Sequence, residues 1–491
     1  MAKLRYTYKT KPYSHQKKAL KKIFDLEGEA GLFMEMGTGK TKVAIDWASI
    51  CFYNYNLRRV LVVAPLSVLG VWKREIRKHS PVPARIAILS GTTMRKIKVI
   101  QYLRKHKNPQ GIDWIIINYE SVWRESGRTS VEAQLKLWKP NLTIADESHR
   151  IKSASSRQSR SMARIGSSSL MRLALTGTPI TKSPLDLFGQ FRFLNSSIFG
   201  GNWTGFKNHY GIWGGYLRYQ LKRYKNLREL TRITREHSYA IKLEDCIDMP
   251  AKTGDLEDKN GPTIVPVTLS PRAQEIYTKM AKEMIVEFEE FEGKVNVTTS
   301  RIALTRIMRL AQITSGFLPI DDTKEIREFD TAKLDIATDL IEDAVEEAEK
   351  FVVFCRFRHD IARLSESLEK RKIHNIILSG SVPQSKRDGL ILDFHKKKGG
   401  PPVFIAQIAS GSLGIDLTPS RLTAFYSWDY NFGHYRQAVF RTYRNGQTRP
   451  CNFYHLAVPG SIDTTSLDIL RDKGNIAHAV IHDPNILKPK F

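Results

Sequence analysis

The sequence predicts an α/β protein with two parallel-sheet domains and an α-helical region between them. In residues 1–180, short and almost continuously apolar runs alternate with amphipathic helical patterns. The same alternation returns in 351–491, whereas 181–350 is rich in helix-forming residues. Alternation of strand and helix favours a parallel sheet with right-handed crossovers. We therefore expect three parts with these boundaries.

The first part contains four runs typical of buried parallel strands, which are apolar at nearly every position. They are residues 60–65, 114–118, 142–147 and 172–178. Residues 67–79 form an amphipathic helical pattern, and Ser67 is the expected N-cap because its side chain can accept from a first-turn amide.

The last part repeats this pattern. The expected strands are residues 351–357, 375–380, 403–408, 422–428 and 452–458. Residues 359–372 and 384–398 have the composition and spacing of the helices that join such strands.

Charge indicates the kind of partner. The 491-residue chain has 77 Lys and Arg against 50 Asp and Glu, a net charge of +27, which favours a polyanion and first of all nucleic acid. A basic protein merely kept soluble by its charge is the alternative. Apolar residues make up 41%, enough for real cores, which excludes wholesale disorder.

Several classes of protein are not expected. The sequence contains no run of about 18 apolar residues, so no membrane span is expected. The basic start of the chain lacks the apolar segment of a secretory signal peptide. The four cysteines are far apart and form no C-x-x-C pair, which predicts neither a disulfide framework nor a structural metal. We expect a cytoplasmic, nucleoid-associated protein without a membrane partner; protein partners are not predicted.

Two segments combine basic residues with few acids. Residues 149–172 contain six Lys or Arg and no acid, so Arg150 and Lys152 are candidate phosphate contacts. Residues 203–242 contain nine Lys or Arg, two acids and eight aromatics, and Arg223 and Lys225 are candidates there. Aromatics among basic residues can stack on bases, or they can form a core under solvated charges.

The strongest chemical signal is MEMGTGKT at residues 34–41. A glycine-rich turn before a helix offers backbone N–H groups and a helix N-terminus to phosphate oxygens. Lys40 would reach the β- and γ-phosphates, and Thr41 would bind Mg²⁺. Met34 stands where the full motif has its first glycine.

An acidic pair follows the predicted strand 142–147. Asp146 can hold Mg²⁺ through water, and Glu147 can orient the attacking water. In the last part, Arg441 and Arg444 are three residues apart and share one helix face. Such guanidinium groups can reach a γ-phosphate across a cleft, or they can simply face water.

Taken together, these motifs resemble helicase superfamily two, in its Swi/Snf-type branch of DNA translocases, over residues 12–475. The resemblance rests on the segments YSHQ (13–16), EMGTGKT (35–41), VLVVAPLSVLGVWKREI (60–76), INYES (117–121), DESHRIKS (146–153), LTGTPI (175–180), ASGSLGIDLT (409–418) and QAVFRTYRNGQ (437–447). The size resembles compact bacteriophage or bacterial members, and no chromatin-reading module is apparent.

The resemblance implies two RecA-like domains that bind ATP and Mg²⁺ between them, with DNA across both. The implied nucleotide contacts are Gln16, Met36, Gly37, Thr38, Gly39, Lys40, Thr41, Lys42 and Asp416. Gln437 joins Lys40, Asp146, Glu147, Arg441 and Arg444 as catalytic. His149, Thr176 and Thr178 would link nucleotide to DNA, and Ser379, Ser412 and Thr418 would touch phosphates.

Two positions depart from the family pattern. Ser148 replaces Ala, and Asp416 replaces Asn; the Asp416 carboxylate could weaken DNA contact or pair with an arginine. The expected function is an ATP-driven translocase on duplex DNA that remodels branched DNA in replication, recombination or repair. A strand-separating helicase and an inactive nucleic-acid-binding scaffold are the alternatives, with RNA remodelling as a remote fourth.

Overall fold

The computed structural model describes residues 6–123, 127, 129–214, 220–290, 297–320, 325–396, 399–409 and 415–481. The chain divides into two compact units. The first lobe is the described part of Met1–Ile212, Arg223–Asp248 and Ile476–Phe491, and the second lobe is that of Trp213–Lys222 and Met249–Asn475. Each lobe contains a parallel sheet, which confirms the predicted fold class.

The sheet of the first lobe has seven strands, all parallel. In spatial order they are β3 (Ala84–Ile88), β4 (Ile112–Asn118), β2 (Arg59–Ala64), β5 (Leu142–Asp146), β6 (Met171–Leu175), β1 (Glu29–Met34) and β9 (Ser238–Ile241). The central strands are buried almost throughout because helices cover both faces of the sheet. The four predicted strands are confirmed as β2, β4, β5 and β6.

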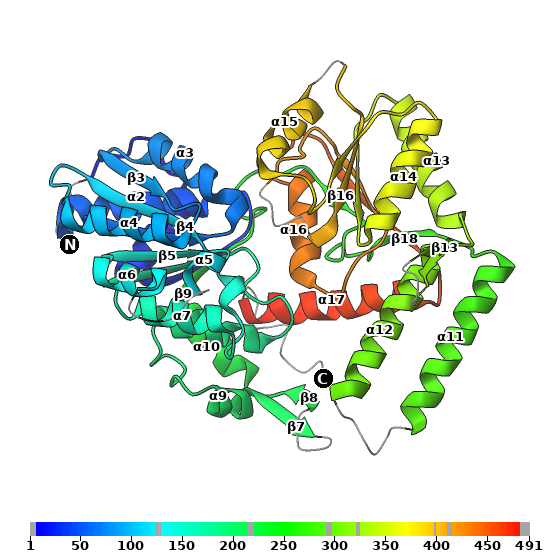
Figure 1. The fold of residues 1–491 in the computed structure, drawn as a ribbon, viewed down its shortest axis with the longest axis horizontal. Helices are drawn as coiled ribbons and strands as arrows, with labels where there is room; N and C mark the ends of the chain where they lie inside the picture. Colours follow the sequence, from blue (N-terminus) through cyan, green and yellow to red (C-terminus); the bar gives the residue numbers. More distant parts are fainter. Residues whose placement is uncertain are drawn as a thin grey trace. The chain divides into compact units, whose positions relative to one another are not determined.

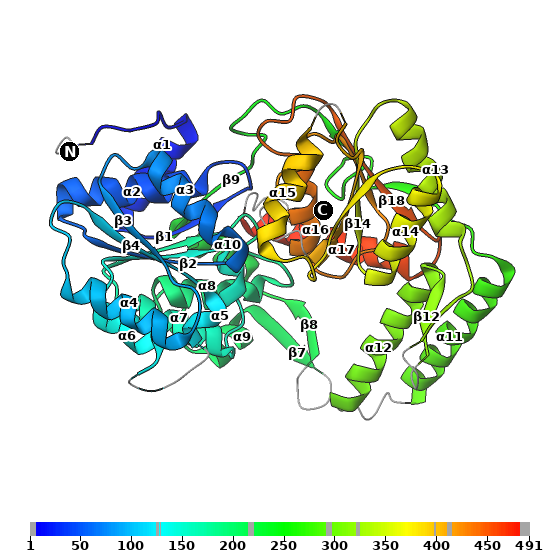
Figure 2. The ribbon, with the colours of Figure 1, turned by 45° about the horizontal axis from the view of Figure 1, so that its top comes forward.

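Helices on one face are α1 (Ser14–Asp25), α2 (Lys40–Tyr55) and α3 (Leu69–His79). On the other face lie α4 (Thr93–Lys105), α5 (Tyr119–Trp123), α6 (Val131–Trp138), α7 (Arg157–Gly166) and α8 (Leu187–Leu194) (Figure 2). The lobe also includes α9 (Trp203–Tyr210) and α10 (Leu227–Glu236). The expected N-cap at Ser67 is wrong: a 3₁₀ turn occupies Leu66–Val68, so α3 begins one residue later with Val68 as its N-cap.

The second sheet is also parallel throughout. Its order is β10 (Lys252–Thr253), β18 (Cys451–Ala457), β17 (Leu422–Phe425), β14 (Phe351–Cys355), β16 (Val403–Gln407) and β15 (Asn375–Leu378), with β11 (Thr263–Pro266) also paired to β18. All five predicted strands of this part are present. The helices are α11 (Pro271–Glu290), α12 (Val297–Thr314), α13 (Ala332–Glu346), α14 (Arg358–Lys370), α15 (Gln384–His395), α16 (Phe432–Thr442) and α17 (Ile462–Ile481).

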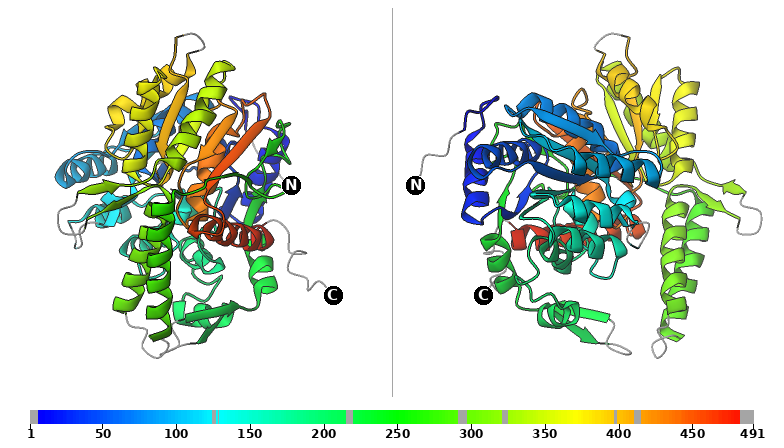
Figure 3. Two further views of the ribbon diagram at one scale, coloured as in Figure 1. Left: turned by 90° about the vertical axis from the view of Figure 1, so that its right-hand side faces the viewer. Right: turned by 60° about the vertical axis from the view of Figure 1, so that its left-hand side comes forward.

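Residues 181–350 differ from the helical insertion that the sequence predicts. Their strand β9 is an edge of the first sheet, and β10 and β11 extend the second. Two short hairpins also lie here, β7–β8 (Gly211–Gly214 and Gln220–Tyr224) and β12–β13 (Phe317–Pro319 and Ile326–Glu328). The region also contains helices, α8, α9 and α10 in the first lobe and α11, α12 and α13 in the second, and the α11–α12 pair stands away from the second sheet (Figure 3). The boundaries at 180 and 350 stay predictions.

Candidate nucleotide site and nucleic-acid interface

The phosphate loop connects β1 to α2. The loop runs from Glu35 to Gly39, and Gly37 and Gly39 have φ angles of +83° and +82°, which glycine adopts without strain. A Cβ on Gly39 would lie 2.3 Å from Nε2 of Gln16, so another residue there would displace the Gln16 side chain and would be strained by the left-handed backbone. The loop therefore holds its backbone close to the N-terminus of a 16-residue helix, a good cradle for phosphate oxygens.

Lys40 lies over this loop. Its ammonium group donates to the carbonyl oxygens of Met34, at 2.7 Å, and Glu35, at 3.0 Å. Thr41 is half-buried in the first turn of α2. The side chain of Lys42 is directed elsewhere: it pairs with Asp46 at 2.6 Å in the interior, so only its backbone amide belongs to the predicted phosphate site.

Gln16 contacts the loop rather than open solvent. Its Nε2 donates to the carbonyl of Thr38 at 3.1 Å, and its Oε1 accepts from the backbone N–H of Tyr13. His15, which sequence reasoning did not single out, places Nε2 2.8 Å from the same carbonyl. The exposed ring of Tyr13 stacks on the ring of His15. The predicted base-reading segment therefore adjoins the phosphate loop.

The acidic pair follows β5, at the sheet edge where β1 and β6 also end. Oδ2 of Asp146 accepts from the indole N–H of Trp72 at 2.8 Å, and Oδ1 accepts from the backbone N–H of Glu147. The hydroxyl of Tyr119 donates to the Asp146 carbonyl. Glu147 has a left-handed backbone with φ of +51°, which aims its carboxylate differently from that of Asp146. The carboxylates of Asp146 and Glu147 and the hydroxyl of Thr41 are oxygen ligands of the kind that Mg²⁺ takes, and Lys40 adds a positive charge near Asp146.

Burial, and to a smaller degree the neighbouring Glu147 carboxylate, raise the pKa of Asp146 to about 6. The group is therefore increasingly protonated below that pH, and a divalent cation must then displace the proton. We expect Mg²⁺-dependent binding of a fluorescent ADP analogue to weaken as pH falls from about 8 to about 5. Trp72→Phe removes a hydrogen-bond donor that stabilises the ionised carboxylate of Asp146. In this variant the pH at which half of the analogue binding is lost should therefore be higher than in the unmodified protein. Equal midpoints for both proteins would contradict this account of Asp146.

A polar network joins the acidic pair to the end of β6. Nδ1 of His149 lies 3.0 Å from the Thr176 hydroxyl and 3.3 Å from Oε2 of Glu147. The Thr176 hydroxyl also accepts from the backbone N–H of Thr178. The Thr178 hydroxyl is buried with no hydrogen-bond partner within the described ranges. The structure thus brings together the three residues that the resemblance implies as links between nucleotide and DNA.

Ser148 has a structural partner that explains its tolerance in this motif. It is buried, and its hydroxyl donates to Oε1 of Gln190 on α8 at 2.8 Å. Nε2 of Gln190 in turn donates to the carbonyls of Pro179 and Asp186. The hydroxyl therefore satisfies a buried acceptor and stays away from the nucleotide.

The basic candidates after this motif are paired within the first lobe. Arg150 lies 3.1 Å from Glu120, and Lys152 contacts Thr181 and lies 3.7 Å from Asp186. Burial lowers the pKa of Lys152. Arg157 and Arg160, in the first half of α7, are exposed. They offer charge to a phosphate more directly than Arg150 and Lys152 do.

The 203–242 segment fits the second interpretation of its composition, in which aromatics form a core under solvated charges, and stacking on bases stays a prediction. Aromatic side chains pack into a cluster made of Phe188, Phe191, Phe199, Trp203, Phe206 and Tyr210. Arg223 on β8 and Lys225 just after it are exposed. Tyr216 and Tyr219 lie outside the described residues. Most of the described aromatics therefore build a core, while the basic candidates face solvent.

In the second lobe, the arginine motif begins on α16 and continues past the end of that helix at Thr442. Arg441 lies on the helix and Arg444 lies after it, so the expectation that the two arginines share one helix face is wrong. Arg441 is almost fully buried, and NH1 of Arg441 and of Arg444 lie 3.4 Å and 3.2 Å from the carbonyl of Ile415. Gln437 is buried, and within the described residues its Oε1 has no hydrogen-bond partner. Both arginines thus face the loop before β17 rather than bulk water.

The loop before β17 contains Asp416, the second position at which the sequence departs from the family pattern. Oδ1 of Asp416 accepts from the backbone N–H of Thr418 at 3.0 Å and from its hydroxyl at 2.8 Å. The carboxylate therefore shapes a local turn and neutralises no arginine in these contacts, and an asparagine oxygen could make the same bonds. The hydroxyl of Ser379 lies 2.7 Å from that of Ser381. Ser412 lies outside the described residues.

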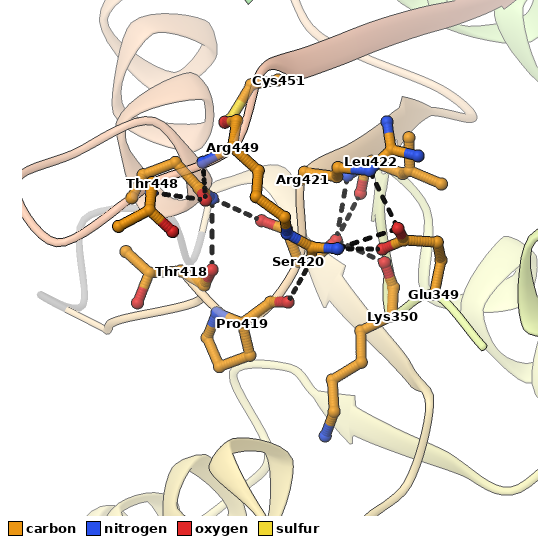
Figure 4. A network of polar contacts seen from close by, with 11 residues as sticks. Glu349, Lys350, Thr418, Pro419, Ser420, Arg421, Leu422, Thr448, Arg449 and Cys451 are labelled. Carbon is orange, nitrogen blue, oxygen red and sulfur yellow. Dashed lines mark hydrogen bonds and ion pairs between the residues drawn. The ribbon is translucent and has the colours of Figure 1, made fainter. Parts of the chain in front are cut away.

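Gln447 is a buried residue next to the candidate site that sequence reasoning missed, although GQ ends the arginine motif. Its buried amide contacts the backbone of the same loop and of α16, within a network that also includes Glu349, Arg421 and Arg449 (Figure 4). Its importance depends on contacts between distant segments, so only the position beside Arg444 could have pointed to it.

Comparisons with known proteins place these motifs in context. Residues 15–316 match the SNF2-related domain, and residues 332–446 match the helicase conserved C-terminal domain. An uncharacterized ATP-dependent helicase of Mycoplasma genitalium is 24% identical over 96% of this chain and 43% of its own length. The DNA annealing helicase and endonuclease ZRANB3 of Homo sapiens is 26% identical over 91% of this chain and 38% of its own.

A third relative is the DNA repair and recombination protein RDH54 of Saccharomyces cerevisiae, 24% identical over 87% of this chain and 46% of its own length. This chain thus spans less than half the length of these curated relatives. The SWI2/SNF2 ATPase core of Sulfolobus solfataricus, solved in complex with double-stranded DNA, is 21% identical, with a TM-score of 0.43 over 98% of this chain and 99% of that one. Among the described helices, none is both long and apolar enough to cross a membrane.

Proposed function

This chain belongs to the SNF2-related family, and from that premise we propose that it is an ATP-dependent translocase on duplex DNA that remodels branched DNA. The observation that carries the proposal is the nucleotide site itself, in which Lys40, Asp146 and Glu147 meet at one sheet edge. The names of two relatives support a role on branched or recombining DNA: ZRANB3 is a DNA annealing helicase and endonuclease, and RDH54 is a DNA repair and recombination protein.

ATP is the substrate in this proposal, and Mg²⁺ would supply charge neutralisation at its β- and γ-phosphates. Lys40 exchanges its contacts with the carbonyls of Met34 and Glu35 for phosphate oxygens. Thr41 and Asp146 would hold the cation, and Glu147 would orient the attacking water. Gln16, beside the loop, positions the base.

The second lobe contributes charge to the same reaction in this proposal. Arg441 and Arg444 leave the carbonyl of Ile415 and stabilise the developing charge on the γ-phosphate. DNA phosphates bind Thr418 and Ser379 in this lobe, together with exposed arginines such as Arg157 and Arg160 in the first. Contacts of this kind position the motor without reading sequence.

The proposal is tested by measuring ATP hydrolysis by the purified protein at fixed salt with no DNA, single-stranded DNA, blunt duplex and a four-way junction. Stimulation by duplex that is strongest with the junction supports it. Stimulation by single strands alone would favour a strand-separating helicase instead, and absence of hydrolysis with every DNA would contradict an active motor.

Salt dependence tests the contribution of the basic surface. With a net charge of +27, we expect duplex binding to weaken steeply as salt rises. The slope of log K against log salt is about −0.9 for each phosphate neutralised, because each contact releases condensed counterions. The measurement is a fluorescence-anisotropy titration at several salt concentrations. Arg157→Ala should reduce the magnitude of the slope by about 1, the value expected for one lost phosphate contact. A flat response in the unmodified protein would contradict binding through phosphates.

A further inference from the structure

One buried amide connects two segments of the second lobe that the proposed function uses separately. Gln447 is 6% exposed. Its Nε2 donates toward the carbonyls of Ser420 at 3.0 Å, Thr418 at 3.1 Å and Thr442 at 3.3 Å. Its Oε1 accepts from the backbone N–H groups of the two following residues, Thr448 and Arg449. Three carbonyls on one side and two N–H groups on the other fix the orientation of the amide.

The segments that this amide joins have different roles. Thr418 and Ser420 belong to the loop of residues 415–420 before β17, where DNA phosphate is proposed to bind. Thr442 is the last residue of α16 and follows Arg441 directly. A change in the position of one segment can therefore reach the other through this side chain.

Further bonds make the loop and the arginine helix one unit. The backbone N–H of Leu417 donates to the carbonyl of Arg441 at 2.9 Å. The side chains of Arg441 and Arg444 both contact the carbonyl of Ile415. Arginines that turn toward a phosphate would release Ile415, but the Gln447 bonds involve no arginine side chain and would persist.

An outer brace fixes the far end of the loop. Arg421 donates to Glu349 at 3.0 Å, and Arg449 donates to both oxygens of the same carboxylate and to the carbonyl of Pro419 (Figure 4). The hydroxyl of Ser420 donates to the carbonyl of Lys350, the residue before β14. The loop is thus held firmly where it meets the sheet.

We propose that Gln447 is the positioning residue that transmits DNA contact at the 415–420 loop to Arg441 at the end of α16 and to Arg444 just after it. The inference rests on the proposed function and deepens it. A phosphate that binds Thr418 pulls on the carbonyls bonded to the amide, and the amide carries the displacement to Thr442 and so to Arg441. DNA stimulation of ATP turnover depends on this connection, whereas turnover without DNA does not.

The test compares Gln447→Glu with the unmodified protein. The substitution keeps the size of the side chain but places a carboxylate oxygen against three carbonyls, because the donor is lost. We expect the ratio of duplex-stimulated to DNA-free turnover to fall about tenfold, within the range typical of coupling between two sites. DNA-free turnover and the ATP concentration for half-maximal rate should stay unchanged.

Gln407→Glu is the matched control. Gln407, at the end of β16, donates to a single carbonyl, that of Arg356, at 3.3 Å. The same change of an amide to a carboxylate there should leave the stimulation ratio unchanged. If both variants lose stimulation equally, added charge rather than the bridge is responsible, and the proposal is overturned.

A second variant keeps the proposal testable if Gln447→Glu does not fold. The Arg449 side chain is 46% exposed, so Arg449→Met should fold, and it weakens the same loop from outside. A smaller loss of the stimulation ratio is expected. Unchanged stimulation in Arg449→Met and in any folded Gln447 variant overturns the inference, as does an equal loss of stimulated and DNA-free turnover. Absence of stimulation in the unmodified protein would instead contradict the proposed function.

Discussion

Glu147→Gln will reduce ATP turnover by about a thousandfold or more, while nucleotide and DNA binding persist. The amide keeps the shape of the side chain but cannot accept a proton or orient water as a carboxylate does; loss of such a group typically costs about 10²–10⁴ in rate. Its contacts with His149 and Thr176 mean that the change also alters the network toward β6. Steady-state turnover, with and without duplex, measures the effect.

Lys40→Ala should abolish turnover through a different step, because the ammonium that contacts the phosphates is lost. Nucleotide affinity should fall with it, whereas DNA binding should survive.

Glu120→Gln is the matched control for Glu147→Gln: it is the same isosteric change, made at an acid of the first lobe that pairs with Arg150. Loss of DNA binding in both active-site variants would mean that Lys40 and Glu147 support the fold rather than the chemistry.

Arg444→Ala will lower duplex-stimulated turnover by about 10³-fold or more, the effect typical of an arginine that stabilises a transferring phosphoryl group. Affinity for ATP should change only modestly, because the interaction strengthens in the transition state. In the described structure Arg444 and Arg441 both contact the Ile415 carbonyl, so the change removes one of these two contacts with the loop. Single-turnover hydrolysis and nucleotide titration separate the two parameters.

Arg471→Ala provides the comparison for this experiment. Arg471, on α17, is 46% exposed and pairs only loosely with Asp468 at 3.2 Å. Its removal deletes one positive charge from the second lobe and should leave turnover as it was. Unchanged turnover in Arg444→Ala would refute a role for this arginine in hydrolysis.

The strands could be predicted from sequence where both faces are buried, because such strands are apolar at every position. β1 and β3 were not predicted, for different reasons. β1 (EAGLFM) begins with a charged residue and contains Gly31, so its apolar run is short. β3 (ARIAI) is an edge strand and is only half-buried, which weakens its pattern. β9 joins the first sheet through pairing with β1, a tertiary contact that local sequence does not encode.

Much of the candidate site could be predicted because motif residues are close together in sequence. Lys40 lies at the phosphate loop, Asp146 and Glu147 lie at the end of β5, and their catalytic roles stay predictions. Partners that come from distant segments could not be predicted, since they depend on packing. Trp72, 74 positions from Asp146, is one such residue. The pairing of Arg150 with Glu120 is another, and charge density alone cannot distinguish a paired arginine from an exposed one.

The left-handed backbone of Glu147 has a consequence for directed evolution. A residue with a Cβ is strained at φ of +51°, by about 1–3 kcal/mol, whereas glycine adopts this conformation freely. Catalysis and thermal robustness therefore favour different residues at this position. A library selected only for survival after heating would drift toward glycine at 147, and its winners would be inactive. Each round of such a selection should include a turnover assay.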